Sequence, residues 1–318
     1  MRHINIIMYH YIRDLKCSRY PNIKGLDIIL FKRQLEFLLQ NYKIIRMDDL
    51  LEAFVGGCLP ENAILLTFDD GYIDNFTYVF PLLAESNIQG SFFPVSSVLD
   101  SSVLLDVNKI HLTLATGNEA DLYDSFIKEI DYHRGIEFDI PKTNDLIMEY
   151  AIPNRFDSGE IIFFKRMLQT VLPERLRKIL INKLFIQFVG VNETIIAKEL
   201  YCDYKQLSLM KKSGMYIGLH GHEHIWLGNK TKDEYENDID QAINFMDCVK
   251  LIDKNAWVMN YPYGSWNNGV VDYVKNHGCL AGLTTKAASA DLTKNNKFTL
   301  PRLDTNDFPP ISVNYINM

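Results

Sequence analysis

The sequence predicts an α/β protein whose strands form a parallel sheet or barrel. Short apolar runs alternate with helical patterns over most of the chain, and several of those helical patterns end near a glycine, as helices commonly do. The 318 residues are 47% hydrophobic and 23% charged, which are ordinary values for a globular protein. These values exclude a disordered, collagen-like or disulfide-scaffold chain.

Six apolar runs have the length and composition of strands. They lie at residues 4–8, 63–68, 91–95, 215–219, 256–259 and 280–284. Four segments space their apolar residues three and four apart, which predicts helices. These segments lie at residues 31–40, 48–54, 204–212 and 270–277. A fifth helix is predicted to begin at the capping-box pattern Thr231-Lys-Asp-Glu234 and to run to about Val249.

One long stretch, from about residue 101 to 203, breaks the alternation with helical patterns and no predicted strand. We expect a helical insertion into a single domain that spans residues 1–318. Between Glu160 and Phe188 the stretch carries six basic and two acidic residues, a local charge of +4. The basic face is either solvated or docks a phosphate-bearing substrate or a partner.

Charge and cysteine content restrict the function further. Thirty-three Lys+Arg against 40 Asp+Glu give a net charge of −7, so we expect no nucleic-acid partner. The five cysteines are scattered and form no metal-binding spacing, which predicts reduced thiols and no structural zinc. The N-terminal apolar run is too short for a signal peptide, and no stretch reaches the roughly 18 apolar residues of a membrane span. We therefore expect a cytoplasmic protein with no transmembrane segment.

Two adjacent carboxylates, Asp69 and Asp70, follow the strand predicted at 63–68 in the sequence Thr-Phe-Asp-Asp-Gly. Neighbouring residues at a strand end point in different directions, which suits one metal ligand and one base. The two carboxylates of a glycosidase instead flank the sugar from opposite sides. The alternative is an Asp-Asp-Gly surface turn.

Three histidines follow the next predicted strand, in His220-Gly-His222-Glu-His224. A metal is the simplest explanation, because histidine contributes little to a core unless its ring nitrogens are satisfied. Two histidines and one carboxylate would form a His₂Asp set with open positions, as catalytic zinc requires. The alternatives are a His-rich turn and an H-x-x-E-H metalloprotease, although that protease motif expects a helix.

A third cluster, Asn260-Tyr-Pro-Tyr-Gly followed by Ser-Trp-Asn, comes just after the strand predicted at 256–259. Its aromatic rings could stack on a sugar and a backbone N–H of the turn could stabilise an oxyanion; a plain turn is the alternative. All three clusters, and His10, follow predicted strand ends. In a parallel barrel those ends converge on one face.

In order and spacing these segments resemble the metal-dependent polysaccharide deacetylases of the NodB-homology type, carbohydrate esterase family 4. Thr-Phe-Asp-Asp-Gly is similar to the first family motif, His220-Gly-x-x-His224 to the second, and Asn-Tyr-Pro-Tyr-Gly to the R-x-P-Y third motif. The opening Met-Tyr-His-Tyr-Ile resembles the poly-N-acetylglucosamine deacetylase subgroup. The resemblance covers the core strands from residue 4 to 284 but not the insertion. It implies a distorted or incomplete (β/α)7–8 barrel with a helical insertion.

The resemblance also implies roles for individual residues. Asp69 would be the general base, and a divalent cation would be bound, zinc first, with cobalt or nickel as alternatives. The implied metal ligands are Asp70, His220 and His224. Tyr263 would supply the backbone N–H of an oxyanion hole. The remaining substrate-binding candidates are Tyr261, Pro262, Trp266 and His222.

The sequence departs from the family pattern at three places. Gly221 stands where the family often has Ser or Thr. Asn260 replaces the arginine of the third motif, and we expect Arg302 to reach Asp69 in its place, an ordinary surface salt bridge being the alternative.

The third departure concerns the general acid. No L-x-H motif follows the third cluster, so the usual acid histidine is missing. His10, at the end of the first strand, is the first candidate to replace it, and His222 is the rival. For each, the alternative is a histidine on a loop surface.

The implied reaction removes an N-acetyl group from an acetylated amino sugar and releases acetate. The substrate is a glycan precursor, a nucleotide- or carrier-linked sugar, or a polysaccharide. Two alternatives stay open: an N-deformylase of a sugar, and a deacetylase-like protein that binds sugar with weak or no turnover.

Overall fold

The computed structural model describes residues 3–99, 103–154 and 157–317. Its contacts divide the chain into two compact units. Unit 1 consists of Met1–Asp14, Gly25–Val103 and Ala197–Met318, and unit 2 of Leu15–Lys24 and Leu104–Ile196. Residue 101, the predicted start of the insertion, lies outside the described residues. Whether the chain is one domain with an insertion stays a prediction.

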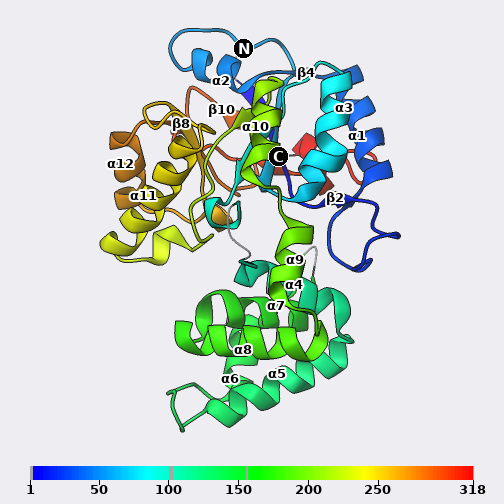
Figure 1. Cartoon of the computed structure of the whole chain (residues 1–318), viewed down its shortest axis with the longest axis vertical. Coiled ribbons are helices and arrows are strands. Elements are labelled where there is room, and N and C mark those ends of the chain that lie inside the picture. The colour runs from blue at the N-terminus through cyan, green and yellow to red at the C-terminus, as the bar shows by residue number, and fades with distance from the viewer. Residues whose placement is uncertain (1–2, 100–102, 155–156, 318) are drawn as a thin grey trace. The chain divides into compact units, whose positions relative to one another are not determined.

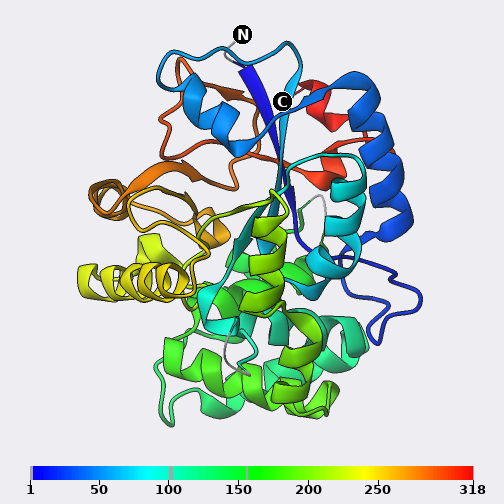
Figure 2. The ribbon, with the colours of Figure 1, turned by 45° about the horizontal axis from the view of Figure 1, so that its top comes forward.

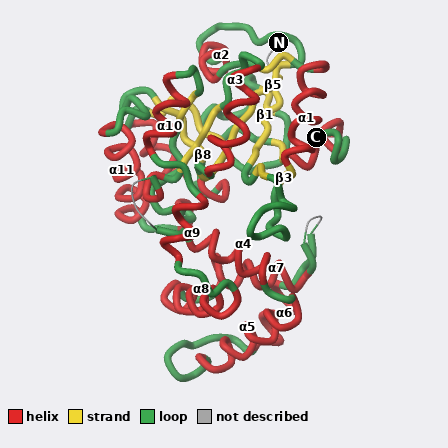
Figure 3. The backbone as a smooth tube through the Cα atoms, turned by 45° about the vertical axis from the view of Figure 1, so that its right-hand side comes forward, coloured by secondary structure: helices red, strands yellow, loops and turns green. Residues whose placement is uncertain are grey.

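A seven-stranded sheet forms the centre of unit 1 (Figure 3). Its main path runs β10-β1-β5-β6-β7, with β4 beside β5 and β11 beside β1. The strands are β1 (His3–Tyr9), β4 (Lys43–Ile44), β5 (Ala63–Asp70), β6 (Ser91–Pro94), β7 (Tyr216–Ile217), β10 (Ala290–Asp291) and β11 (Leu303–Asp304). Among these described strands, β10 alone pairs antiparallel. The central pair, β1 and β5, lies side by side in Figure 2.

Two further parallel pairs lie outside this sheet. They are β2 (Ile12–Arg13) with β3 (Leu26–Asp27), and β8 (Trp257–Asn260) with β9 (Cys279–Leu283). Isolated parallel bridges extend the pairing, Leu219 to Met259 and Leu283 to Leu300. The α/β class predicted from the sequence is thereby confirmed.

Strand β5 shows why the sheet forms where it does. All eight of its residues, Ala-Ile-Leu-Leu-Thr-Phe-Asp-Asp, are buried, as expected of a parallel strand covered on both faces. The ring of Phe68 stacks between Tyr9 and Phe92, at centroid distances of 5.0 and 4.8 Å. The strand nevertheless ends in two buried acids. Burying a carboxylate is costly unless it is paired or binds a cation, so this end of the sheet needs partners.

Helices flank the strands of unit 1, and Figure 1 shows α11 beside α12. They are α1 (Ile28–Asn41), α2 (Met47–Ala53), α3 (Phe80–Glu85), α10 (Tyr204–Lys212), α11 (Lys232–Cys248) and α12 (Asn268–Asn276). The capping box predicted at Thr231 is present, with Glu234 accepting from the backbone of Thr231. Each helix predicted from apolar spacing is found, with ends that move by at most three residues.

Residues 15–24 of unit 2 form turns and bends, and most of its other described residues lie in α-helices. They are α4 (Asp106–Thr116), α5 (Glu119–His133), α6 (Thr143–Tyr150), α7 (Gly159–Arg166), α8 (Glu174–Phe188) and α9 (Glu193–Leu200), the last of which continues into unit 1. Unit 2 has a hydrophobic core of its own, in which the rings of Phe126, Phe163 and Phe164 pack with Leu180. Among the described helices, none is by itself long and apolar enough to cross a bilayer, while α8 and α9, bent by 87°, pass that test as a pair by length and composition.

Candidate metal centre and active site

Asp70, His220 and His224 meet at one end of the sheet of unit 1. Oδ1 of Asp70 lies 3.3 Å from Nε2 of His220 and 3.3 Å from Nε2 of His224. All three residues are buried, and one ligand atom from each lies within 4.8 Å of the others. The structure thus brings together the three residues that the sequence predicts as a His₂Asp metal site.

The unpaired atoms of this cluster fit a divalent cation. Nδ1 of His220 is 2.6 Å from the carbonyl oxygen of Asn260, so it donates a proton there and leaves Nε2 with a lone pair. Oδ2 of Asp70 accepts the hydroxyl of Tyr72 at 2.7 Å, whereas buried Oδ1 has no hydrogen-bond partner among the described residues. A lone carboxylate oxygen facing imidazole nitrogens is costly without a cation. Two nitrogens and one oxygen are a donor set that zinc accepts.

Two of these candidate ligands, Asp70 and His224, have a left-handed backbone conformation. Asp70 has φ +69° and His224 has φ +54°, which non-glycine residues rarely adopt. Gly71 follows with φ +73°, and a Cβ there would lie 2.7 Å from Cβ of Pro94. Such strain persists only where the surroundings hold it, and it concentrates at functional sites.

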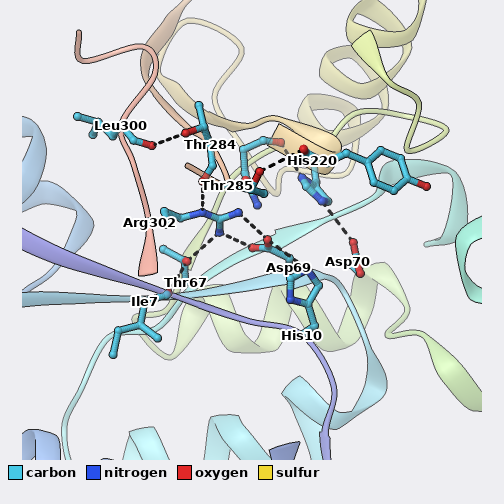
Figure 4. A network of polar contacts seen from close by, with 12 residues as sticks. Ile7, His10, Thr67, Asp69, Asp70, His220, Thr284, Thr285, Leu300 and Arg302 are labelled. Atoms are coloured by element: carbon cyan, nitrogen blue, oxygen red, sulfur yellow. Dashed lines mark hydrogen bonds and ion pairs between the residues drawn. The ribbon is translucent and has the colours of Figure 1, made fainter. Parts of the chain in front are cut away.

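Asp69 is bound by Arg302 (Figure 4). The guanidinium donates to both carboxylate oxygens, Nη1 to Oδ1 at 2.9 Å and Nη2 to Oδ2 at 2.8 Å. Arg302 is itself held by the carbonyl of Thr284 and the hydroxyl of Thr67, at 2.9 and 3.0 Å. The predicted contact is therefore present. It is a buried bidentate pair and not the surface salt bridge that was the alternative.

The charge state of Asp69 suits a general base. Burial acts to raise the pKa of Asp69, but the charge and hydrogen bonds of Arg302 outweigh burial and hold that pKa below its ordinary value. Asp69 is therefore ionised near neutral pH. An ionised carboxylate next to the candidate metal ligands can accept a proton from water.

The two candidate acids occupy different surroundings. Nε2 of His10 lies 3.7 Å from Oδ2 of Asp69, and its side chain is 41% exposed. Nδ1 of His222 lies 2.8 Å from the hydroxyl of Ser96. The geometry therefore places His10 beside Asp69, whereas His222 pairs with Ser96, the first residue of a 3-10 turn.

The third cluster divides into buried and accessible rings. Tyr263, at φ +57°, stacks on Trp226 with ring centroids 4.4 Å apart and packs edge-on against His224. Trp266 is 41% exposed, and its role in sugar binding stays a prediction. Tyr261 is 0% exposed, so the expectation that its ring stacks on a sugar is corrected: the ring belongs to the core. Pro262 is also buried.

Sequence reasoning missed Asp238, which binds the histidine loop from helix α11. Its buried carboxylate accepts the backbone N–H groups of His222 and Glu223, at 3.0 and 2.9 Å. A signal was present, because Asp238 lies three residues after Tyr235 and four before Ala242, both of which are buried. Helical periodicity therefore places this acid on the inner face. Tyr72, which fixes Asp70, was missed as well.

Comparisons with solved structures show that the fold is shared with other proteins. A chain from the Streptococcus pyogenes deacetylase PplD in complex with acetate superposes with a TM-score of 0.58 at 15% identity, covering 99% of this chain and 96% of that one. IcaB from Ammonifex degensii gives a TM-score of 0.57 at 14% identity, covering 98% and 97%. At such identities the likeness concerns the fold.

Sequence comparison adds a curated relative and a family. The poly-beta-1,6-N-acetyl-D-glucosamine N-deacetylase of Escherichia coli strain K12 is 39% identical over 98 residues, which are 30% of this chain and only 14% of that protein. A family model described as polysaccharide deacetylase matches residues 56–123 and 187–282, slightly more than half of the chain, including all three candidate metal ligands. The chain therefore belongs to the polysaccharide deacetylase family.

Proposed function

We propose that this protein is a metal-dependent N-deacetylase of acetylated amino sugars. The proposal rests on one observation: the two adjacent carboxylates at the end of β5 have different partners. Asp69 is held ionised by Arg302, while Asp70 turns an unpaired oxygen toward His220 and His224. One acid is suited to proton transfer and the other to holding a cation.

The cation would be held by Oδ1 of Asp70 and Nε2 of both histidines, with zinc as our first choice and cobalt or nickel as alternatives. When bound, a divalent cation supplies Lewis-acid polarisation of the amide carbonyl and makes water more acidic. Among the described residues the donor set has three protein ligands, so a bound cation would keep a coordination position for water or substrate.

The protein's own groups then move the protons. Asp69 takes a proton from the water that attacks the acetyl carbonyl carbon. The backbone N–H of Tyr263 donates to the carbonyl oxygen as negative charge develops there. His10 gives a proton to the amine nitrogen as the C–N bond breaks, which yields acetate and a free amino sugar.

The substrate we propose first is a short β-1,6-linked oligomer of N-acetylglucosamine. Two observations support this choice. The Escherichia coli relative is named as a poly-beta-1,6-N-acetyl-D-glucosamine N-deacetylase. The ring of Tyr263 packs against His224 at the site, and Trp266, three residues further along the chain, is 41% exposed. Aromatic faces commonly pack against apolar surface of a ligand while leaving polar groups free to pair.

We also propose that the strands of unit 1 complete an irregular barrel. The bridge from Leu219 to Met259 links the β7 side to β8, and the bridge from Leu283 to Leu300 links β9 to the segment that leads into β11. Strand β11 pairs back to β1. A ring of this kind would bring the carboxyl ends of the strands to one face.

Acetate release tests the function. The full chain is stripped with a chelator, restored with Zn²⁺, Co²⁺ or Ni²⁺, and incubated with N-acetylglucosamine oligomers, monomeric N-acetylhexosamines and nucleotide-linked N-acetyl sugars. We expect metal-dependent acetate release from at least one of them, and none from the Asp70→Asn variant. Formate release from N-formyl sugars without acetate release would replace the proposal by deformylation. Release of neither acid from any of these sugars would overturn it.

A further inference from the structure

The loop that carries the two candidate histidine ligands is held by hydrogen bonds between its peptide groups and residues outside the loop. Residues 220–224 lie between β7 and the 3-10 turn Leu227–Asn229, and they have neither helical nor strand pairing of their own. Backbone N–H groups in such a segment need acceptors elsewhere. The acceptors for two successive N–H groups, those of His222 and Glu223, are the two oxygens of the Asp238 carboxylate.

The opposite side of the same loop is held by the 3-10 turn η2 (Ser96–Val98). The backbone N–H of Ser96 donates to the carbonyl of Gly221, and that of Ser97 donates to the carbonyl of His222, both at 3.1 Å. Asp238 therefore binds the N–H groups of one short peptide run, and this turn binds its carbonyl groups. His220 and His224 stand at its two ends.

Gly221 fits the space beside Asp238. Its φ is +74°, and a Cβ at this position would lie 2.9 Å from Oδ2 of Asp238 and 3.3 Å from Cγ of Pro262. A serine or threonine here would therefore bring its Cβ against the carboxylate in a strained backbone conformation. The loop thus has no side-chain hydroxyl at residue 221, and a carboxylate from α11 occupies the space next to it.

We propose that Asp238 is the positioning residue of the histidine loop, holding the peptides of residues 222 and 223 so that Nε2 of His220 and of His224 both face Asp70. The inference rests on the metal site of the proposed function. Asp238 is 4% exposed, so its hydrogen bonds are protected from water and each is charge-assisted. Groups that orient ligands in this way commonly change metal affinity by about 10- to 100-fold when they are mutated.

The test measures the zinc affinity of the full chain and does not depend on enzyme activity. Zn²⁺ is titrated into the metal-free protein against a competing chromophoric chelator, for the wild type, Asp238→Asn and Asp238→Ala. Asparagine preserves shape but offers one acceptor oxygen and turns an NH₂ group toward the other backbone N–H. We expect Asp238→Asn to raise the zinc Kd by about 10- to 100-fold, with the unfolding temperature of the metal-free protein within a few degrees of wild type.

Asp240 supplies the matched control. It lies on the same helix and accepts the hydroxyl of Tyr273 at 2.7 Å, away from the histidine loop. Asp240→Asn should leave the zinc Kd within about threefold of wild type. The visible absorption spectrum of the cobalt-loaded protein adds a readout of ligand geometry, and we expect it to change in Asp238→Asn but not in Asp240→Asn.

Each outcome decides the inference. A folded Asp238→Asn protein with the wild-type zinc Kd and cobalt spectrum would overturn the positioning role alone. Wild-type protein that binds zinc but releases no acid from any sugar would overturn the proposed function and leave the positioning role standing. Wild-type protein that binds no divalent metal would overturn both. If Asp238→Ala fails to fold, Asp238→Asn still decides.

Discussion

Arg302 grips both carboxylate oxygens of Asp69, at 2.9 and 2.8 Å, although 233 residues separate the two in sequence. Both side chains are almost completely buried. A buried pair of this kind is costly to break, because the remaining charge is left without a partner in a poorly solvated place. The base of the proposed reaction therefore depends on a residue from the far end of the chain.

Replacing Asp69 by Asn should abolish turnover while sparing metal binding. The amide cannot accept a proton from water, and loss of a positioned general base typically costs about 10²- to 10⁴-fold in rate. The measurement pairs the rate of acetate release with the zinc content of the purified variant. Wild-type activity in a fully loaded Asp69→Asn protein would remove Asp69 from the role of base.

Replacing Arg302 by Lys should shift the acidic limb of the kcat/KM profile to higher pH. Burial raises the pKa of Asp69 and Arg302 lowers it, so weakening the bidentate pair lets that pKa rise. A base with a raised pKa is protonated at a higher pH, and activity is then lost earlier as the pH falls. The full profile of each variant is measured at saturating metal.

Arg13→Lys is the control for the general effect of weakening an arginine–aspartate ion pair. Nε of Arg13 binds Oδ2 of Asp74 at 2.7 Å in the same unit, without a hydrogen bond to Asp69 among the described contacts. The acidic limb of the kcat/KM profile of Arg13→Lys should lie at the same pH as in the wild type. An unshifted limb in Arg302→Lys, or equal shifts in both variants, would contradict the assignment.

Most of the metal site could be predicted from the sequence, because each of its residues directly follows a readable apolar run. Asp70 is the last residue of β5, whose Ala-Ile-Leu-Leu run is buried on both faces. The histidines follow a weaker strand, of which only Tyr216 and Ile217 pair as β7, yet the polar cluster after it still marked the site. The short strands β2, β3, β4, β10 and β11 have two residues each and carry no detectable periodicity.

Side-chain direction was harder to predict than position. Tyr261 follows β8, and the sequence alone could not tell on which side of the strand end its ring lies. The ring turns inward and is fully buried, since neighbouring residues of an extended segment point to opposite faces. The role of Asp238 was hidden for a different reason. It depends on a contact between a helix and a loop 15 and 16 residues apart in sequence, which no local pattern encodes.

The two candidate acids can be separated by their alanine variants. His10 lies 3.7 Å from Asp69 and is partly open to solvent, whereas Nδ1 of His222 is engaged by Ser96. A positioned general acid typically contributes about 10²- to 10⁴-fold to the rate. We therefore expect kcat to fall by about that factor in His10→Ala and by much less in His222→Ala. Both are assayed with equal zinc content. A larger loss in His222→Ala than in His10→Ala would reverse the assignment.

Removing the metal should destabilise unit 1 and not merely stop turnover. Without a cation, buried Oδ1 of Asp70 has no hydrogen-bond partner among the described residues and faces two imidazole nitrogens, so zinc binding should favour the folded state. At a free zinc concentration of 100 times Kd the stabilisation is about 2.7 kcal/mol, which predicts a rise of several degrees in the unfolding temperature. Thermal unfolding is followed with chelator and with added zinc. His224→Ala lacks one ligand and should show little of this rise, whereas an equal rise in that variant would mean that zinc binds elsewhere.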